Sequence, residues 1–147
     1  MQKETVKIRI ISKSGNMPKY ETIGSAGFDL PAFLEEPVTL APGERMLVPT
    51  GIYMEIPEGY EAQVRARSGL AIKHGIGLVN GIGTIDSDYR GELRVPLINW
   101  GQEPFTIENG DRIAQVVIAR YIRAELELAD SLSHTTRGEG GFGHTGV

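Results

Sequence analysis

Residues 45–66 read RMLVPTGIYMEIPEGYEAQVRA, and this stretch indicates the fold of the chain. It contains three short apolar runs, which are broken at Pro49-Thr50-Gly51 and at Pro57-Glu58-Gly59. Runs of this length that are bounded by proline and glycine turns are typical of β-strands. The stretch therefore predicts consecutive short strands joined by tight turns.

The same pattern continues along the rest of the chain, in which 19 glycines and 8 prolines are spread over 147 residues. Further strand-like runs lie at residues 6–10, 93–99, 105–107 and 113–122, with turn signals at 41–44, 100–102 and 108–111. Many short strands at regular spacing predict an all-β sandwich or barrel. One short helix is expected at residues 68–74. Residues 122–128 contain helix formers, but they follow a β-branched run and lack a cap.

Charge and composition exclude several classes of function. The net charge is −4, with 15 basic and 19 acidic residues, so we expect no general nucleic-acid partner. The chain has no cysteine, which excludes disulfides, thiolate zinc sites and cysteine nucleophiles. The N-terminal sequence MQKETVKIRI has no continuous apolar core, and no run approaches the length of a membrane span. We expect a cytoplasmic protein that does not bind membranes.

The length fits one domain, and no internal repeat is present. We expect a single β-domain at residues 1–131 and a separate C-terminal segment at residues 132–147. This segment ends in RGEGGFGHTGV, residues 137–147, which has five glycines and no aliphatic residue before the last position. Such a segment is either a frayed terminus or a mobile lid that orders on a ligand. It lacks the Gly-Lys-Ser/Thr of a phosphate-binding loop and the strand and helix of a dinucleotide fingerprint.

Four other segments combine turn residues with chemically able side chains: AGFDL at 26–30, RSGLA at 67–71, NGIGTIDSDYRG at 80–91 and GDRIAQ at 110–115. In the second, Ser68 is expected to cap a helix whose N-terminus, with Arg67, suits an anion. In the third, Asn80-Gly81 predicts a hairpin turn, followed by a carboxylate able to orient water and an aromatic ring able to stack. Taken singly, each segment is also explained by a bulge, a capped helix, a hairpin tip or a tight turn. The three histidines, His74, His134 and His144, show no metal-ligand spacing.

Together, these five segments in this order resemble the homotrimeric deoxyuridine triphosphatase (dUTPase) family, over residues 24–147. The resemblance implies a jelly-roll-like distorted β-barrel and a homotrimer with three active sites, each assembled from all three subunits. It implies hydrolysis of dUTP to dUMP and pyrophosphate by attack of water on the α-phosphate. That activity limits uracil incorporation into DNA and supplies dUMP for dTMP synthesis. It also implies Mg²⁺ as cofactor.

The resemblance assigns the base and sugar to the third segment. The backbone around Asn80, Gly83, Thr84 and Ile85 would hold uracil, with Arg94 on the return strand. Tyr89 would lie under the deoxyribose and exclude a 2′-hydroxyl group.

The resemblance also assigns the triphosphate and the chemistry. Asp86 would position the attacking water, and Ser68 would donate to the oxygen that bridges the α and β phosphates. Phosphate oxygens would be bound by Arg67, Gln115 and the backbone of Gly69. Asp29 would act on Mg²⁺ through water.

The C-terminal segment resembles the family's lid, contributed by a neighbouring subunit. Phe142 would stack on uracil, while Arg137 and Thr145 would bind the γ-phosphate and Gly143 would let the backbone pass close to the substrate. Many family members have serine at the position of His144, to which we assign no role.

Two rival interpretations stay open. The deoxycytidine triphosphate deaminases share the fold, but they typically have tryptophan at the position of Tyr89 and a different tail. A non-catalytic trimeric β-module would not need Asp86 or Arg67.

Overall fold

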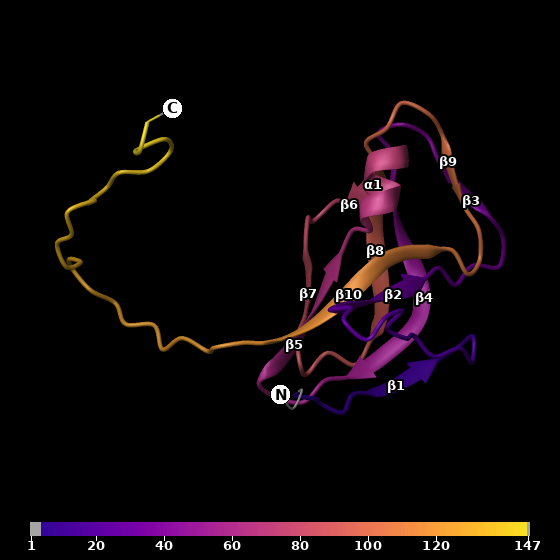
Figure 1. The fold of residues 1–147 in the computed structure, drawn as a ribbon, viewed down its shortest axis with the longest axis horizontal. Helices are drawn as coiled ribbons and strands as arrows, with labels where there is room; N and C mark the ends of the chain where they lie inside the picture. The colour runs from indigo at the N-terminus through magenta and orange to yellow at the C-terminus, as the bar shows by residue number, and fades with distance from the viewer. Residues whose placement is uncertain (1–3, 147) are drawn as a thin grey trace.

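The computed structural model describes residues 4–146, and Figure 1 shows a body built of β-strands that is followed by a long C-terminal arm. Within these residues the body contains ten strands and one helix. The elements are β1 (Arg9–Ser12), β2 (Gly27–Pro31), β3 (Val38–Leu40), β4 (Arg45–Glu55), β5 (Tyr60–Arg65), α1 (Ser68–His74), β6 (Ile76–Leu78), β7 (Gly83–Ile85), β8 (Glu92–Asn99), β9 (Phe105–Ile107) and β10 (Arg112–Arg120).

The strands form two four-stranded sheets and a two-stranded ribbon. The strand orders are β1-β4-β8-β6 and β2-β10-β5-β7, and β3 pairs with β9. Apolar side chains from both large sheets meet in one buried cluster, so the sheets form a sandwich of the jelly-roll type. The predicted all-β fold with one short helix is confirmed.

Strand β8 shows why these sequences form a sandwich. Leu93, Val95 and Leu97 are buried, whereas Arg94 between the first two is exposed. Successive side chains of a strand point to opposite faces, so this alternation directs one face of β8 to the core. The facing sheet contributes its own buried residues, among them Leu30.

Three local predictions need correction. The break at Pro49-Thr50-Gly51 does not end a strand, because β4 is continuous and its register with β8 shifts between Pro49 and Tyr53. Strand β1 begins three residues later than the run at 6–10 suggested, and β10 ends before Ile122. In each case pairing with a neighbouring strand sets the bounds, and sequence periodicity does not report that pairing. No helix forms at residues 122–128, in agreement with the missing cap and the β-branched run before them.

Helix α1 occupies the predicted residues, but the predicted serine cap is wrong. The cap position is Arg67, which has extended backbone (φ −88°, ψ 131°) and makes no capping hydrogen bond through its side chain. The helix ends at Gly75 in the left-handed conformation, and Lys73 and His74 in the last turn suit the negative end of the helix dipole.

The arm leaves the body after β10 and runs away from it (Figure 1). Its aliphatic side chains Ile122, Leu126, Leu128 and Leu132 are almost completely exposed. The predicted division of the chain at residue 131 stays a prediction, and residues 1–3 and 147 lie outside the described part. Within residues 4–146, no helix has the length and apolar character needed to cross a bilayer.

Asn99, at the end of β8, is the completely buried polar residue that joins several parts of the body. Its Nδ2 donates to the carbonyl oxygens of Leu40 (2.9 Å) and Glu103 (2.8 Å), and its Oδ1 accepts from the Gly101 N–H (2.8 Å). One side chain therefore satisfies three backbone groups from β3 and the loop before β9.

We expect Asn99→Ala to lower the free energy of unfolding by about 3 kcal/mol or more, because it leaves buried backbone groups without partners. Chemical unfolding at fixed protein concentration measures this loss. Asn109→Ala is the matched control, since the exposed Asn109 side chain accepts one bond from the Leu34 N–H and should cost about 1 kcal/mol. Equal losses in the two variants would contradict the special role of Asn99.

Candidate active site

Strand β10 brings together three segments that are far apart in the sequence. It lies between β2 and β5, and Gln115 is opposite Asp29 on one side and Arg65 on the other. Gln115 donates from Nε2 to the Ala66 carbonyl at 3.0 Å, just before Arg67. The first, second and fourth predicted segments therefore share one end of this sheet.

Asp29 and two arginines form a half-buried charged cluster at that end. Arg67 Nε lies 3.4 Å from Asp29 Oδ1, and Arg112 Nη1 lies 3.5 Å from both Asp29 Oδ2 and Glu21 Oε1. Arg67 also donates to the carbonyl oxygen of Arg112 at 3.0 Å. These contacts hold the Arg67 guanidinium in place before any ligand arrives, which is what recognition of an anion requires.

Gly27 sets the position of the Gln115 side chain. A Cβ atom at residue 27 would lie 2.8 Å from Gln115 Oε1 and 3.2 Å from the carbonyl oxygen of Val116. A side chain at residue 27 would therefore displace the Gln115 amide from its present place against β2. Beside this cluster, Ser68 and Gly69 are exposed in the first turn of α1, where helical N–H groups have no acceptor within the helix.

The second group of predicted residues surrounds the turn between β6 and β7. The turn is present, with Gly81 at φ 72°, the Gly81 N–H bonded to the Leu78 carbonyl (3.0 Å) and the Ile82 N–H to the Asn80 carbonyl (2.8 Å). The predicted hairpin is wrong, because β6 pairs with β8 in one sheet and β7 pairs with β5 in the other. Each of the two strands is therefore an edge strand of its own sheet.

Asn80 and Gly83 lie side by side at this opening. A Cβ atom at Gly83 would be 3.3 Å from Asn80 Nδ2, so the amide group folds over the start of β7. Thr84 is exposed and Ile85 is half-buried on β7. Edge backbone and one amide side chain thus offer donors and acceptors at a single place.

Asp86, Tyr89 and Arg94 lie beyond β7. Asp86 is exposed, and its carbonyl accepts from the Tyr89 N–H at 3.2 Å. The Tyr89 hydroxyl group donates to the Glu92 carbonyl at 2.8 Å. Arg94 Nε lies 3.6 Å from Glu92 Oε1.

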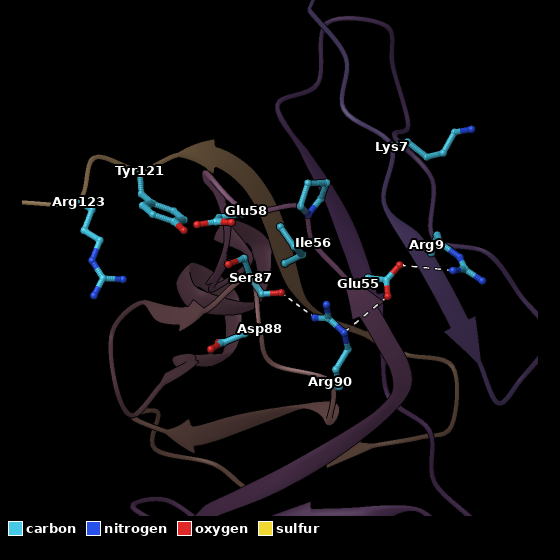
Figure 2. A pocket seen from close by; sticks show the side chains of 11 residues that line it. Lys7, Arg9, Glu55, Ile56, Glu58, Ser87, Asp88, Arg90, Tyr121 and Arg123 are labelled. Carbon is cyan, nitrogen blue, oxygen red and sulfur yellow. Dashed lines mark hydrogen bonds and ion pairs between the residues drawn. The ribbon is translucent and has the colours of Figure 1, made fainter.

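Arg90 ties this loop to β4 along the wall of a pocket of about 600 Å³ (Figure 2). Its Nη1 donates to the carbonyl oxygens of Ser87 (2.7 Å) and Tyr89 (3.2 Å), and its Nε lies 3.7 Å from Glu55 Oε1.

Sequence reasoning assigned no role to Arg90 or Glu92. Local spacing contained no signal for them, because their partners are set by the packing of β4 against β8. Outside the candidate site, Tyr53 on β4 raises the pKa of Lys13, which follows β1, through a side-chain hydrogen bond.

The two groups do not meet within one chain. Gly83 is opposite Val64 and Ile85 is opposite Ala62, so β7 carries Asp86 away from the Arg65 end of β5. Arg67 is five residues beyond Ala62, roughly 16 Å of extended backbone. Ser68 is farther still. The predicted residues therefore form two separate candidate half-sites. They are named here after the part of the nucleotide that each is expected to contact: a phosphate-side cluster (Asp29, Arg67, Ser68, Gly69 and Gln115) and a base-side cluster (Asn80, Gly83, Thr84, Ile85, Asp86, Tyr89 and Arg94).

The predicted lid residues contact neither half-site. Arg137 Nε donates to the Gly140 carbonyl within the arm at 2.7 Å, and Phe142 is completely exposed. Gly143 and Thr145 follow on the same arm, which extends away from the body (Figure 1).

Asp29 is the predicted contact for a metal ion. Among residues 4–146, no three histidine, cysteine, aspartate or glutamate side chains gather in a way that would hold one. Each carboxylate oxygen of Asp29 faces a guanidinium group, so the site does not suit a metal held by protein ligands alone. It does suit an ion that keeps its waters and takes its other ligands from phosphate groups.

Comparison with known proteins agrees with this geometry. A family model described as dUTPase matches residues 13–146. Two relatives are named deoxyuridine 5′-triphosphate nucleotidohydrolase. The protein from Finegoldia magna is 56% identical over 142 residues, 96% of this chain and 99% of its own length. The protein from an Anaeromyxobacter species is 61% identical over 145 residues, 97% of each chain.

Solved structures give the same answer. The dUTPase of Staphylococcus bacteriophage 80alpha, determined with dUPNHPP, has a TM-score of 0.87 and 29% identity, and the match covers 97% of this chain and all of that one. A mutant dUTPase from phage phi11 of S. aureus, described with a structural Mg(II) ion, has a TM-score of 0.75 and 25% identity over 87% of this chain and 98% of its own. The chain belongs to the dUTPase family.

Proposed function

We propose that the protein hydrolyses dUTP to dUMP and pyrophosphate through attack of water on the α-phosphate. The observation that carries this proposal is the register of β10, which places Asp29, Arg67 and Gln115 together beside the first turn of α1. A guanidinium group held in place, an amide and free helical N–H groups form a set of donors suited to a triphosphate. Membership of the dUTPase family supplies the identity of the nucleotide.

The base-side cluster is proposed to hold uracil. Because β7 is the edge strand of its sheet, backbone groups on its outer edge are available to pair with the edge of a planar base. The Asn80 amide, folded over Gly83, adds a donor and an acceptor, with Thr84 and Ile85 continuing the edge and Arg94 on the neighbouring strand. Tyr89 would lie against the deoxyribose.

Asp86 and Ser68 are proposed as the catalytic residues. Asp86 would orient the attacking water, and its exposure leaves the carboxylate accessible to solvent. Ser68 would donate to the bridging oxygen as charge develops on the leaving pyrophosphate, while Arg67, Gln115 and the Gly69 N–H would bind phosphate oxygens. Alignment and charge stabilisation, more than a strong base, account for most of the rate in phosphoryl transfer.

The separation of the half-sites supports a homotrimer with shared active sites. Asp86 and Arg67 of one chain cannot act on one α-phosphate, so a complete site needs the base-side cluster of one subunit and the phosphate-side cluster of another. The arm supports the same assembly, because an alternation of Ile122, Leu126 and Leu128 with charged residues is a strand pattern that has no partner within the described chain. Such an arm would reach a neighbouring subunit and carry Arg137, Phe142, Gly143 and Thr145 to its site.

Mg²⁺ is proposed as the cofactor, held near the phosphates by Asp29 through water. The ion would supply positive charge that neutralises the triphosphate. Arg67 and Arg112 keep Asp29 in place for this contact. The cytoplasmic location and the role in keeping uracil out of DNA follow from the same proposal and stay predictions.

The first test is a substrate panel with dUTP, dCTP, UTP and dTTP in the presence of Mg²⁺. We expect rapid pyrophosphate release from dUTP alone, and a loss of about 100-fold when the chain is truncated before Arg137, because the lid excludes water and fixes the triphosphate. Glu139→Gln, an unassigned change on the same arm, is the control and should retain activity. Equal rates on all four nucleotides, or ammonia release from dCTP, would overturn the substrate assignment.

Asp86→Asn should lower kcat by about 100-fold or more and change the KM for dUTP by less than about threefold. The amide keeps the size of the side chain but no longer accepts a proton from water. Steady-state kinetics on dUTP measures both parameters, and Asp88→Asn, two residues along the same loop, is the matched control. Full activity in Asp86→Asn would remove Asp86 from the chemistry.

Sharing of the site between subunits is tested by refolding Asp86→Asn chains together with Arg67→Gln chains in equal amounts. Each variant alone should be inactive, whereas random mixing should complete about a quarter of the sites. The control mixture pairs Asp86→Asn with a chain that carries both changes, in which no site is complete. Absence of recovery in the first mixture, with trimers formed, would place Asp86 and Arg67 in the same subunit's site.

A further inference from the structure

The ring of Tyr89 can lie against the backbone at residue 91 because Gly91 has no side chain. A Cβ atom at residue 91 would lie 2.4 Å from the Tyr89 hydroxyl oxygen, 2.6 Å from Cζ and 3.0 Å from Cε1. Cβ atoms do not approach other heavy atoms this closely, so the ring keeps its position only while residue 91 is glycine. The hydroxyl end of the ring therefore packs directly against the backbone at Gly91.

The Tyr89 hydroxyl group is also anchored. It donates to the Glu92 carbonyl at 2.8 Å, and Glu92 is itself fixed at the start of β8. Its side chain, only 10% exposed, accepts from the Gly51 N–H at 2.8 Å and faces Arg94 at 3.6 Å. The acceptor of the tyrosine hydroxyl is thus tied to the irregular part of β4.

The backbone of Tyr89 has a separate anchor. Arg90 donates to the Tyr89 carbonyl at 3.2 Å. Arg90 also pairs with Glu55 on β4, as Figure 2 shows. Ring and backbone are therefore both held although the residue is 43% exposed. An exposed aromatic ring on a loop does not need such anchoring for stability.

We propose that Gly91 is a positioning residue for sugar selection: with the Glu92 carbonyl, it fixes the Tyr89 ring so that the ring presents an apolar face to the sugar. This inference rests on the proposed role of Tyr89 in the dUTPase site. Because the phenol proton is already donated to Glu92, it is not available to a 2′-hydroxyl group. A ribonucleotide would press its 2′-hydroxyl group against the apolar face of the ring and lose water there, and a fixed ring cannot move aside to accommodate it.

The decisive variant is Gly91→Ala. The backbone at residue 91 is not in the left-handed region, so alanine is tolerated there, and the atoms that must move belong to the outer end of one side chain. We expect the thermal midpoint to fall by less than about 3 °C. The ratio of kcat/KM for dUTP to that for UTP should fall about tenfold or more, with a raised KM for dUTP and a kcat within about threefold.

The matched control is Gly24→Ala. Residue 24 is exposed, and a Cβ atom there would meet nothing within 4 Å. This control should keep the dUTP/UTP ratio of the unaltered protein. Tyr89→Phe, which keeps the ring but removes the bond to Glu92, should lower the ratio less than Gly91→Ala does.

A double-mutant cycle separates the action of Gly91 through Tyr89 from general damage to the loop. If the inference holds, Gly91→Ala should have no further effect on the ratio once Tyr89 is alanine. An unchanged ratio in Gly91→Ala, with Tyr89→Ala strongly impaired, overturns the role of Gly91 and leaves the proposed function standing. An unchanged ratio in Tyr89→Ala overturns the sugar role of Tyr89 and the inference with it.

Discussion

The pairing of β5 on both of its edges determines the arrangement of the whole candidate site. On one edge, β10 aligns Gln115 with Arg65 and joins β5 to the strand that carries Asp29. On the other edge, β7 aligns Gly83 with Val64 and directs Asp86 toward the opposite end of the sheet. One strand thus positions both half-sites and also keeps them apart. In the proposed trimer this geometry would link assembly to catalysis, because Asp86 and Arg67 would become neighbours only across a subunit boundary.

Two side chains of the candidate site lie where glycines leave room for them, because a Cβ atom at either glycine would be too close. Gly27 makes space for Gln115 on the phosphate side, and Gly91 makes space for Tyr89 on the sugar side. In both cases the side chain is also anchored by a hydrogen bond to a backbone carbonyl. Polar and aromatic groups that are fixed before the ligand arrives lose less conformational entropy on binding, and they discriminate more sharply between similar ligands.

The arm contrasts with the body in its physical character. The body buries its aliphatic residues in one core between two sheets, whereas the arm leaves Ile122, Leu126 and Leu128 in solvent. Beyond them, the glycine-rich end makes hydrogen bonds only with itself among those described. A segment with this composition gains little from folding on its own chain, which agrees with the proposal that it orders on a neighbouring subunit and a bound nucleotide.

The strand-rich fold and the bounds of α1 were predictable from the sequence, because alternation of apolar residues and turn signals are local properties. Short motifs, also local, named candidate residues for both half-sites. The sequence predicted a hairpin at Asn80-Gly81 that does not form: the turn is local, but the pairing partners of β6 and β7 are chosen by the two sheets. It predicted Ser68 as the cap of α1, whereas the cap position is Arg67, because the end of β5 decides where the helix begins. The close contacts at Gly27 and Gly91 and the separation of Asp86 from Arg67 came only from the tertiary structure. They depend on which backbones approach each other in space, and sequence spacing contains no measure of that distance.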